Sequence, residues 1–126
     1  MAGLRNPAGR VKVRAAHVQR PLVWARSGGR CERCGNGLPV VWECHHRKLR
    51  SQGGDWSLSN LLALHMDCHN AGSPTGVHAH PADAYRNGYL VRSAFDPAAA
   101  PVLLHGRNWV LLTPDGAYQP TEAPNA

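Results

Sequence analysis

Large aromatic side chains are scarce in this sequence, which has one phenylalanine, three tyrosines and four tryptophans among its 126 residues. Much of the apolar content is alanine, which covers little surface. We expect one small domain with flexible ends and a core of limited extent. Small domains of this kind commonly depend on a metal site or a disulfide for stability, so the four cysteines matter.

Long apolar runs are missing as well. No stretch is long and apolar enough to span a bilayer, so we expect no membrane partner. Residues 1–20 carry several arginines and no apolar segment, so we also expect no signal peptide and a cytoplasmic location. In a reducing cytoplasm a Cys-x-x-Cys pair indicates a metal or redox site rather than a disulfide.

Acidic residues are rare in the first part of the chain. Residues 1–50 contain eleven Lys and Arg but only Glu32 and Glu43, which gives +9, whereas residues 51–126 carry −3. A basic half of this kind suits a polyanion such as DNA, because each neutralised phosphate releases counterions. Basic residues also keep proteins soluble, so charge alone does not identify the partner.

The apolar and turn-forming residues predict a small α+β fold with both helices and hairpins. Residues 1–16 form a flexible basic arm, 17–93 a central domain, and 94–126 a C-terminal hairpin with a loose tail from Pro114 on. In the central domain we expect helices at 17–27, from Cys68 on and at 81–87, and strands at 38–44 and 61–64. The C-terminal hairpin pairs residues 102–104 with 109–112.

Two pairs of potential metal ligands stand out. Cys31-x-x-Cys34 and His65-x-x-Cys68 have matched spacing, and four ligands of this type suit tetrahedral zinc. The 30 residues between the pairs exceed the spacing of a common zinc ribbon, so a folded insertion such as a hairpin must fill them. A redox pair or buried free thiols are the alternatives. Cys44 could replace His65, but we prefer His65 for its spacing and expect Cys44 to be a small buried hydrophobic residue.

A second group of polar residues lies within that insertion and just after it. The pattern His46-x13-Asn60-x8-His69 resembles the His-Asn-His signature of the HNH endonuclease family in residues and spacing. The resemblance covers residues 18–93, and the stretch 45–60 is similar to small nucleases of actinobacterial phages. It implies a ββα-metal (His-Me finger) core, in which a hairpin is followed by a helix, clamped here by the Cys/His zinc knuckle.

The resemblance also implies a role for each signature residue. His46 would be the general base that takes a proton from the attacking water. His45 and His69 would bind one catalytic divalent ion beside the structural Zn2+. Imidazole ligands favour Mn2+ or another borderline ion such as Co2+, Ni2+ or Zn2+, whereas cellular abundance favours Mg2+. Asn60 would hold the loop after the strand and, through it, the His46 ring. His78 is either a third ligand of the catalytic ion or a solvated loop histidine, displaced by a small insertion at 71–76.

Three basic residues follow the expected base directly. Arg47, Lys48 and Arg50 would contact the phosphate backbone of DNA, with a solvated charged face as the alternative. We expect Trp42 and Trp56 in the core rather than on a base-stacking surface.

The family resemblance implies a metal-dependent DNA endonuclease. We expect single-strand nicks with 5′-phosphate and 3′-hydroxyl ends, made by a monomer or weak dimer. The likeness to phage nucleases suggests processing or packaging of viral DNA beside a phage terminase, in the host cytoplasm. Two alternatives stay open at this point: a zinc-stabilised DNA-binding module without catalysis, and an HNH nuclease that acts on RNA.

Overall fold

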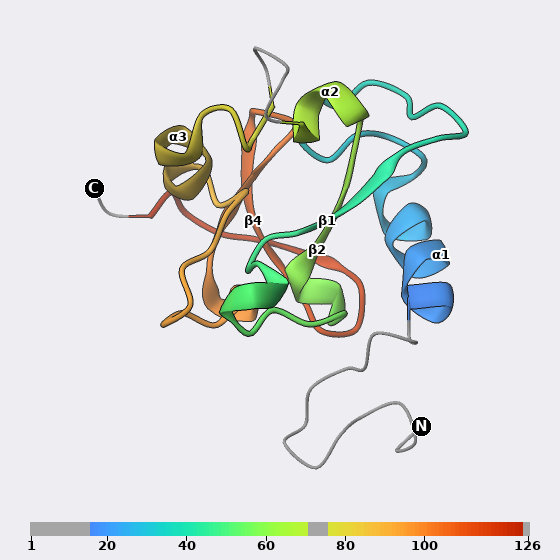
Figure 1. Cartoon of the computed structure of the whole chain (residues 1–126). Coiled ribbons are helices and arrows are strands. Elements are labelled where there is room, and N and C mark those ends of the chain that lie inside the picture. The colour runs from blue at the N-terminus through green and yellow to red at the C-terminus, as the bar shows by residue number, and fades with distance from the viewer. Residues whose placement is uncertain (1–15, 71–75, 125–126) are drawn as a thin grey trace.

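The computed structural model describes residues 16–70 and 76–124, so the predicted arm at 1–16 and the predicted insertion at 71–76 lie almost wholly outside the described residues. The fold is α+β, as predicted, with short antiparallel strands and short helices (Figure 1). The helices are α1 (Ala16–Ser27), α2 (Met66–His69) and α3 (Pro81–Arg86), with 3-10 turns η3 (Arg50–Gln52), η4 (Leu58–Asn60) and η5 (Pro97–Ala99). The strands are β1 (Glu43–His46), β2 (Leu61–Leu64), β3 (Val102–Leu104), β4 (Asn108–Leu112) and β5 (Tyr118–Pro120).

Helix α1 matches the helix predicted for residues 17–27. Pro21 lies inside the helix. Gly28 and Gly29 follow with φ angles of 65° and 74°, a left-handed conformation that glycine adopts at low cost and that ends a helix. Val23 is fully buried and anchors the helix on the central hairpin.

Strands β1 and β2 form that antiparallel hairpin, with Glu43 opposite Leu64 and His46 opposite Leu61. The strand predicted at 38–44 is wrong for residues 38–42, because the strand begins at Glu43 and runs to His46. Val40 and Val41 are 97% and 66% exposed. Their β-branched side chains favour a strand only where a partner and a half-buried face exist, and β2 has only four residues to pair.

All four residues of β2 are buried, so the strand is covered on both faces. Successive side chains on a strand point to opposite faces. Leu61 and Ala63 pack with Val23 of α1, whereas Leu62 and Leu64 pack in a larger cluster with the C-terminal strands. Figure 1 shows the hairpin in the middle of the molecule, with α1 beyond one side of it and α3 beyond the other.

Helix α2 is a single turn that follows β2 and begins two residues before the predicted start at Cys68. Helix α3 confirms the prediction for residues 81–87, with Pro81 in its first turn. It stops at Gly88, whose φ is 80° and whose backbone lies so close to Pro101 that an added Cβ would meet that carbonyl oxygen at 2.0 Å. The close approach joins α3 to the start of β3.

The predicted C-terminal hairpin is present as β3 and β4. The expectation of a loose tail from Pro114 is wrong for residues 118–120, which form β5 and pair with β4. The physical reason is the Tyr118 hydroxyl, which donates a hydrogen bond to the buried Glu32 carboxylate and thereby fixes the strand. No helix in the described part of the chain is long and apolar enough to cross a membrane.

Candidate active site and metal clusters

Three imidazole rings come together beside the central hairpin. His45 lies on β1, His69 on α2, and His78 in the turn that precedes α3. Their candidate ligand nitrogens all lie within 4.8 Å of one another, and the ring centroids are 4.7 to 5.2 Å apart. A backbone hydrogen bond from His78 N to His69 O, 3.4 Å long, places the third histidine. His78 therefore lies with the other two rather than in solvent, whereas His80 is outside the cluster.

The orientation of the His45 ring is fixed by a hydrogen bond to a backbone carbonyl. Its Nε2 lies 2.6 Å from the carbonyl oxygen of Tyr89, which can only accept, so Nε2 donates and Nδ1 keeps its lone pair. A ring held in this way by a carbonyl is the usual arrangement behind a metal-binding histidine. Burial lowers the pKa of His45 to about 3, so the ring is neutral at pH 7.

The donor set of this cluster fits a divalent ion. The Nδ1 atom of His69 is buried and has no hydrogen-bond partner, which is costly for a nitrogen unless it binds a ligand. Three imidazoles whose candidate ligand nitrogens lie within 4.8 Å of one another suit a borderline divalent metal and leave coordination positions open.

His46 is the next residue on the same strand, and its ring has a different neighbour while it remains close enough to His69 to be influenced electrostatically. Its ring meets the Trp56 ring edge-on with centroids 4.5 Å apart, and its buried Nε2 has no hydrogen-bond partner. Because β1 ends at this residue, the chain turns away and leaves the two neighbouring rings in separate surroundings. Burial, helped by the charge of Arg50, lowers the pKa of His46 to about 4.

Asn60 closes the loop that follows His46. Its Oδ1 accepts a hydrogen bond from Lys48 N at 2.7 Å, and its Nδ2 donates to Lys48 O and to Asp55 O at 3.1 and 3.0 Å. Both ends of the loop are thus tied to one side chain. The loop is tight, since a Cβ on Gly54 would lie 1.7 Å from the Lys48 carbonyl oxygen. The geometry agrees with the loop-holding role that the family resemblance implies.

The prediction that Arg47 contacts phosphate is wrong, because its side chain is fully buried. The guanidinium donates to four backbone carbonyls instead, those of Ser59, Gly88, Pro97 and Ala100. Burial lowers the pKa of Arg47 to about 9, which still leaves the group charged at pH 7. The charge of a residue does not show from the sequence whether its side chain will be buried. The carbonyls that accept from Arg47 belong to segments distant in the chain.

The other two predicted DNA contacts lie at the surface. Lys48 is half-buried, and its Nζ donates to Ser93 O at 3.1 Å. Arg50 is exposed and close enough to His46 to influence that ring electrostatically. Trp42 and Trp56, expected in the core, are half-buried and pack against the cluster around Val23.

The second metal cluster has the ligand set preferred from the spacing. The candidate ligand atoms of Cys31, Cys34, His65 and Cys68 lie within 4.8 Å of one another. His65 directs Nδ1 to Cys34 Sγ at 3.2 Å, while its Nε2 donates to Gly37 O at 2.8 Å. These residues form a Cys3His site that can bind a metal. Cys31 and Cys68 are buried in the main core, and Cys34 packs against it.

Cys44 does not join this site. It packs against the cluster around Val23, and burial raises the pKa of its thiol to about 11. Cys44 was expected to be a small buried hydrophobic residue; it packs on the apolar cluster as expected but is only partly buried. All four cysteines are free thiols, so no disulfide competes with metal binding.

Sequence reasoning missed Glu32, which lies between the two cysteines of the first pair and is fully buried. Its carboxylate accepts hydrogen bonds from Arg26 at 2.8 and 2.9 Å, from Ala63 N at 2.8 Å, and from the Tyr118 hydroxyl. One side chain therefore connects the metal knuckle to α1, β2 and β5. An acidic residue inside a Cys-x-x-Cys pair does not indicate these contacts, because its hydrogen-bond partners are far apart in the chain.

Comparison with known proteins agrees with this geometry. Residues 31–74 match the family model of the HNH endonuclease, a segment that includes the whole Cys3His site and His45, His46, Asn60 and His69. No curated protein and no solved structure matches the chain. The matched segment contains the hairpin, helix α2, the Cys3His site and two of the three clustered histidines, whereas His78 lies beyond it. This part of the chain, about a third of its length, is therefore similar to an HNH endonuclease domain.

Proposed function

We propose that the protein is a metal-dependent endonuclease that hydrolyses the phosphodiester bonds of DNA. The observation that carries the proposal is the placement of His46 beside a separate cluster of three imidazoles. Hydrolysis of a phosphodiester needs a base for the attacking water and a cation for the phosphate. A DNA-binding module without catalysis has no need for a free histidine next to a metal cluster.

In this proposal the site residues have three roles: metal binding, proton acceptance and positioning. His45, His69 and His78 hold the catalytic divalent ion, for which three imidazoles favour a borderline ion such as Mn2+, Co2+, Ni2+ or Zn2+ over Mg2+. When bound, the ion would neutralise the phosphate and stabilise the leaving oxygen. A ring nitrogen of His46 accepts the proton of the attacking water, as an imidazole can near neutral pH. Asn60 keeps the loop after His46 closed, and Tyr89 keeps the His45 ring turned so that Nδ1 faces the cluster.

The second cluster is structural in this proposal. Cys31, Cys34, His65 and Cys68 hold Zn2+, since three thiolates and one imidazole are a common closed set for that ion. Lys48 and Arg50, which remain at the surface near His46, contact the DNA backbone. We further propose that the monomer or weak dimer makes single-strand nicks with 5′-phosphate and 3′-hydroxyl ends, and acts on viral DNA beside a terminase in a host cytoplasm.

Plasmid relaxation tests the proposal. Supercoiled DNA is incubated with the protein and Mg2+ or Mn2+, with an EDTA control, and relaxed circles are followed on a gel. We expect His46→Ala to lower the nicking rate by about 10²- to 10⁴-fold, the usual contribution of a general base. His17→Ala, which removes an exposed histidine of α1, is the matched control and should cut at the wild-type rate.

The outcomes separate the competing functions. Equal cutting by His46→Ala and the wild type would exclude His46 as the base. If no metal supports cutting while DNA is still retarded on a gel, the protein is a binding module. If a matched RNA is cut and the DNA is not, the substrate assignment is wrong.

A further inference from the structure

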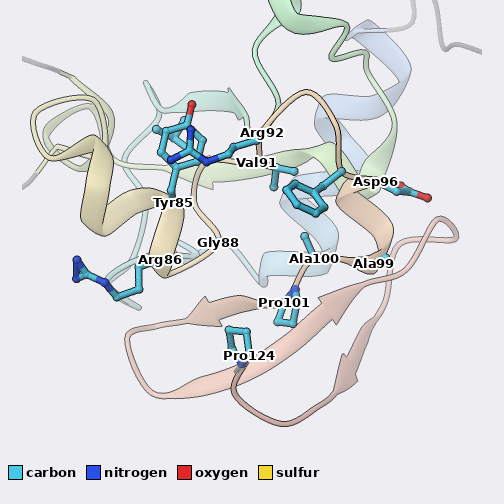
Figure 2. Close-up of a pocket in the computed structure, with 12 residues that line it drawn as sticks. Tyr85, Arg86, Gly88, Val91, Arg92, Asp96, Ala99, Ala100, Pro101 and Pro124 are labelled. Carbon is cyan, nitrogen blue, oxygen red and sulfur yellow. The ribbon is translucent and has the colours of Figure 1, made fainter. Parts of the chain in front are cut away.

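A pocket of about 320 Å3 lies on the C-terminal side of the hairpin, outside both metal clusters. Its walls come from α3, the segment 88–96, residues 99–101 just before β3, and Pro124. Most of its lining is apolar, including Tyr85, Leu90, Val91, Phe95, Ala100 and Pro101. Figure 2 shows Tyr85 and Arg92 on one wall and Ala100, Pro101 and Pro124 on the facing wall. The volume is at the lower end of the range for small-molecule sites and suits one planar ring system.

The rim of this pocket presents stacking surfaces. The guanidinium of Arg92 lies 4.2 Å from the centroid of the Tyr85 ring, and Arg92 itself is exposed. Phe95 is 60% exposed, an unusual position for the one phenylalanine of the chain. Planar cations and aromatic faces at the surface are the features on which proteins stack the bases of single-stranded nucleic acids.

The pocket is connected directly to the catalytic strand. Val91 N donates to Arg47 O at 2.8 Å, so the segment that carries Arg92 runs beside the residue that follows His46. From standard backbone spacings, the Cα atoms of His46 and Arg92 then lie within roughly 13 Å of each other. A stacked DNA strand rises about 3.4 Å per nucleotide and an unstacked one is longer per nucleotide, so this separation is at most about four nucleotides.

The surface between the two places is suited to a phosphate backbone. Lys48 Nζ donates to Ser93 O, which holds an ammonium group beside the residue that follows Arg92. A smaller pocket lined by Lys48 and Asn60 shares Asp96 with the larger one, so the two hollows adjoin. Asp96 is the acid at this boundary, and its carboxylate accepts a hydrogen bond from Ala98 N at the start of η5.

We propose that this pocket binds one unpaired nucleobase of the strand whose phosphodiester lies at His46. The inference rests on the proposed nuclease function and adds a substrate preference to it. An apolar side chain of a partner protein would fill the same volume, but it would gain nothing from the exposed guanidinium or from Lys48 beside it. A base in an intact duplex cannot enter without unstacking, so gapped or single-stranded DNA should be preferred over continuous duplex.

The test compares a DNA strand that carries bases with a strand of the same sugar-phosphate backbone that lacks them. Binding of a fluorescent 12-nucleotide oligothymidylate, and of the same strand with abasic sites in place of the thymines, is measured by anisotropy. No chelator and no divalent ion (Mg2+ or Mn2+) is added, so the strand is not cleaved during the measurement. Phe95→Ala and Arg92→Ala are compared with Phe95→Leu, Phe95→Tyr and Arg107→Ala, an exposed arginine on the β3–β4 turn that matches the charge change.

We expect the wild type to bind the base-bearing strand roughly tenfold more tightly than the abasic one, as one stacked base allows. Phe95→Ala, Phe95→Leu and Arg92→Ala should lose most of that difference, whereas Phe95→Tyr and Arg107→Ala should keep it. If the pocket variants discriminate as the wild type does, the pocket does not bind a base, and an apolar partner side chain becomes its occupant. If the wild type shows no discrimination at all, the proposal is equally wrong.

Nicking of a plasmid is measured in parallel to separate the two proposals. Failure of every metal to support nicking, with Phe95-dependent discrimination intact, would overturn the nuclease function and leave a base-binding surface. Normal nicking with no discrimination would overturn the base pocket alone. Phe95 and Arg92 are both exposed, so their replacement should leave the melting temperature unchanged, and this is checked for each variant.

Discussion

Replacement of Arg47 by leucine tests the distinction between a DNA contact and an internal support. The guanidinium donates to Gly88 O at 2.8 Å, Ser59 O at 2.9 Å, Pro97 O at 3.0 Å and Ala100 O at 2.7 Å. These carbonyls belong to three segments that pack around the end of β1. Arg47→Leu keeps an apolar stem but removes every donor, so the carbonyls of Ser59, Gly88 and Ala100 lose this partner, while Pro97 O keeps its bond from Ala100 N.

The size of the effect follows from two opposing contributions. Each buried carbonyl left without a donor costs about 1–3 kcal/mol. Removal of a buried charge recovers part of this, because burial also disfavours the cation, as the pKa of about 9 for Arg47 indicates. We expect a net loss of about 3–5 kcal/mol, a large share of the 5–15 kcal/mol typical of a domain. At about 4 °C per kcal/mol, the melting temperature should fall by roughly 15 °C.

The assay is thermal unfolding followed by circular dichroism, paired with DNA binding at two salt concentrations. Arg50→Leu is the matched control, because it removes the same charge three residues away from an exposed position. It should leave the melting temperature within about 2 °C of the wild type and weaken DNA binding, with a smaller salt dependence. The reasoning is refuted if Arg47→Leu melts like the wild type and its main defect is in DNA affinity.

Three further changes test the metal clusters and the buried pair. Cys31→Ser should lose one metal ion per molecule by elemental analysis and unfold or melt much earlier, because small metal domains draw folding free energy from the ion; an unchanged cooperative melt would contradict this. His78→Ala should keep the fold but need at least tenfold more divalent ion for half-maximal nicking, since one of three imidazoles is gone; an unchanged metal titration would remove His78 from the site. Glu32→Gln should cost about 3–5 kcal/mol in a urea melt, because Arg26 would keep a buried charge without its partner; a loss below about 1 kcal/mol would show that the pair contributes little.

The metal clusters were the most predictable part of the molecule. Ligands that bind one ion from a tight turn recur at short fixed spacings, so Cys31-x-x-Cys34 and its counterpart at Cys68 are visible in the sequence alone. The third imidazole was harder to assign, because the segment before His78 has no regular spacing to the other histidines. His78 is placed by a backbone hydrogen bond from its N–H to the carbonyl of His69. A backbone contact of this kind leaves no pattern of side chains in the sequence.

The mistaken predictions have a common physical cause. Arg47 and the two valines at 40 and 41 were interpreted from residue type, but their environment depends on segments distant in the chain. Four carbonyls converge on Arg47 and make burial of its charge tolerable, whereas no strand reaches Val40 and Val41. The same holds for β5, which pairs because one tyrosine finds a buried carboxylate eighty-six residues earlier.

These distant contacts also explain why the site needs more of the chain than its family signature. The match ends at residue 74, yet the ring of His45 is held by the carbonyl of Tyr89, and the guanidinium of Arg47 is held by residues 88, 97 and 100. Residues 77–100 therefore act as the support for a hairpin of only four residue pairs. A hairpin of this length is marginal alone, so its histidines owe their positions to that segment. Because the same segment lines the proposed base pocket, changes in it would alter the positions of the ligands and the choice of substrate together.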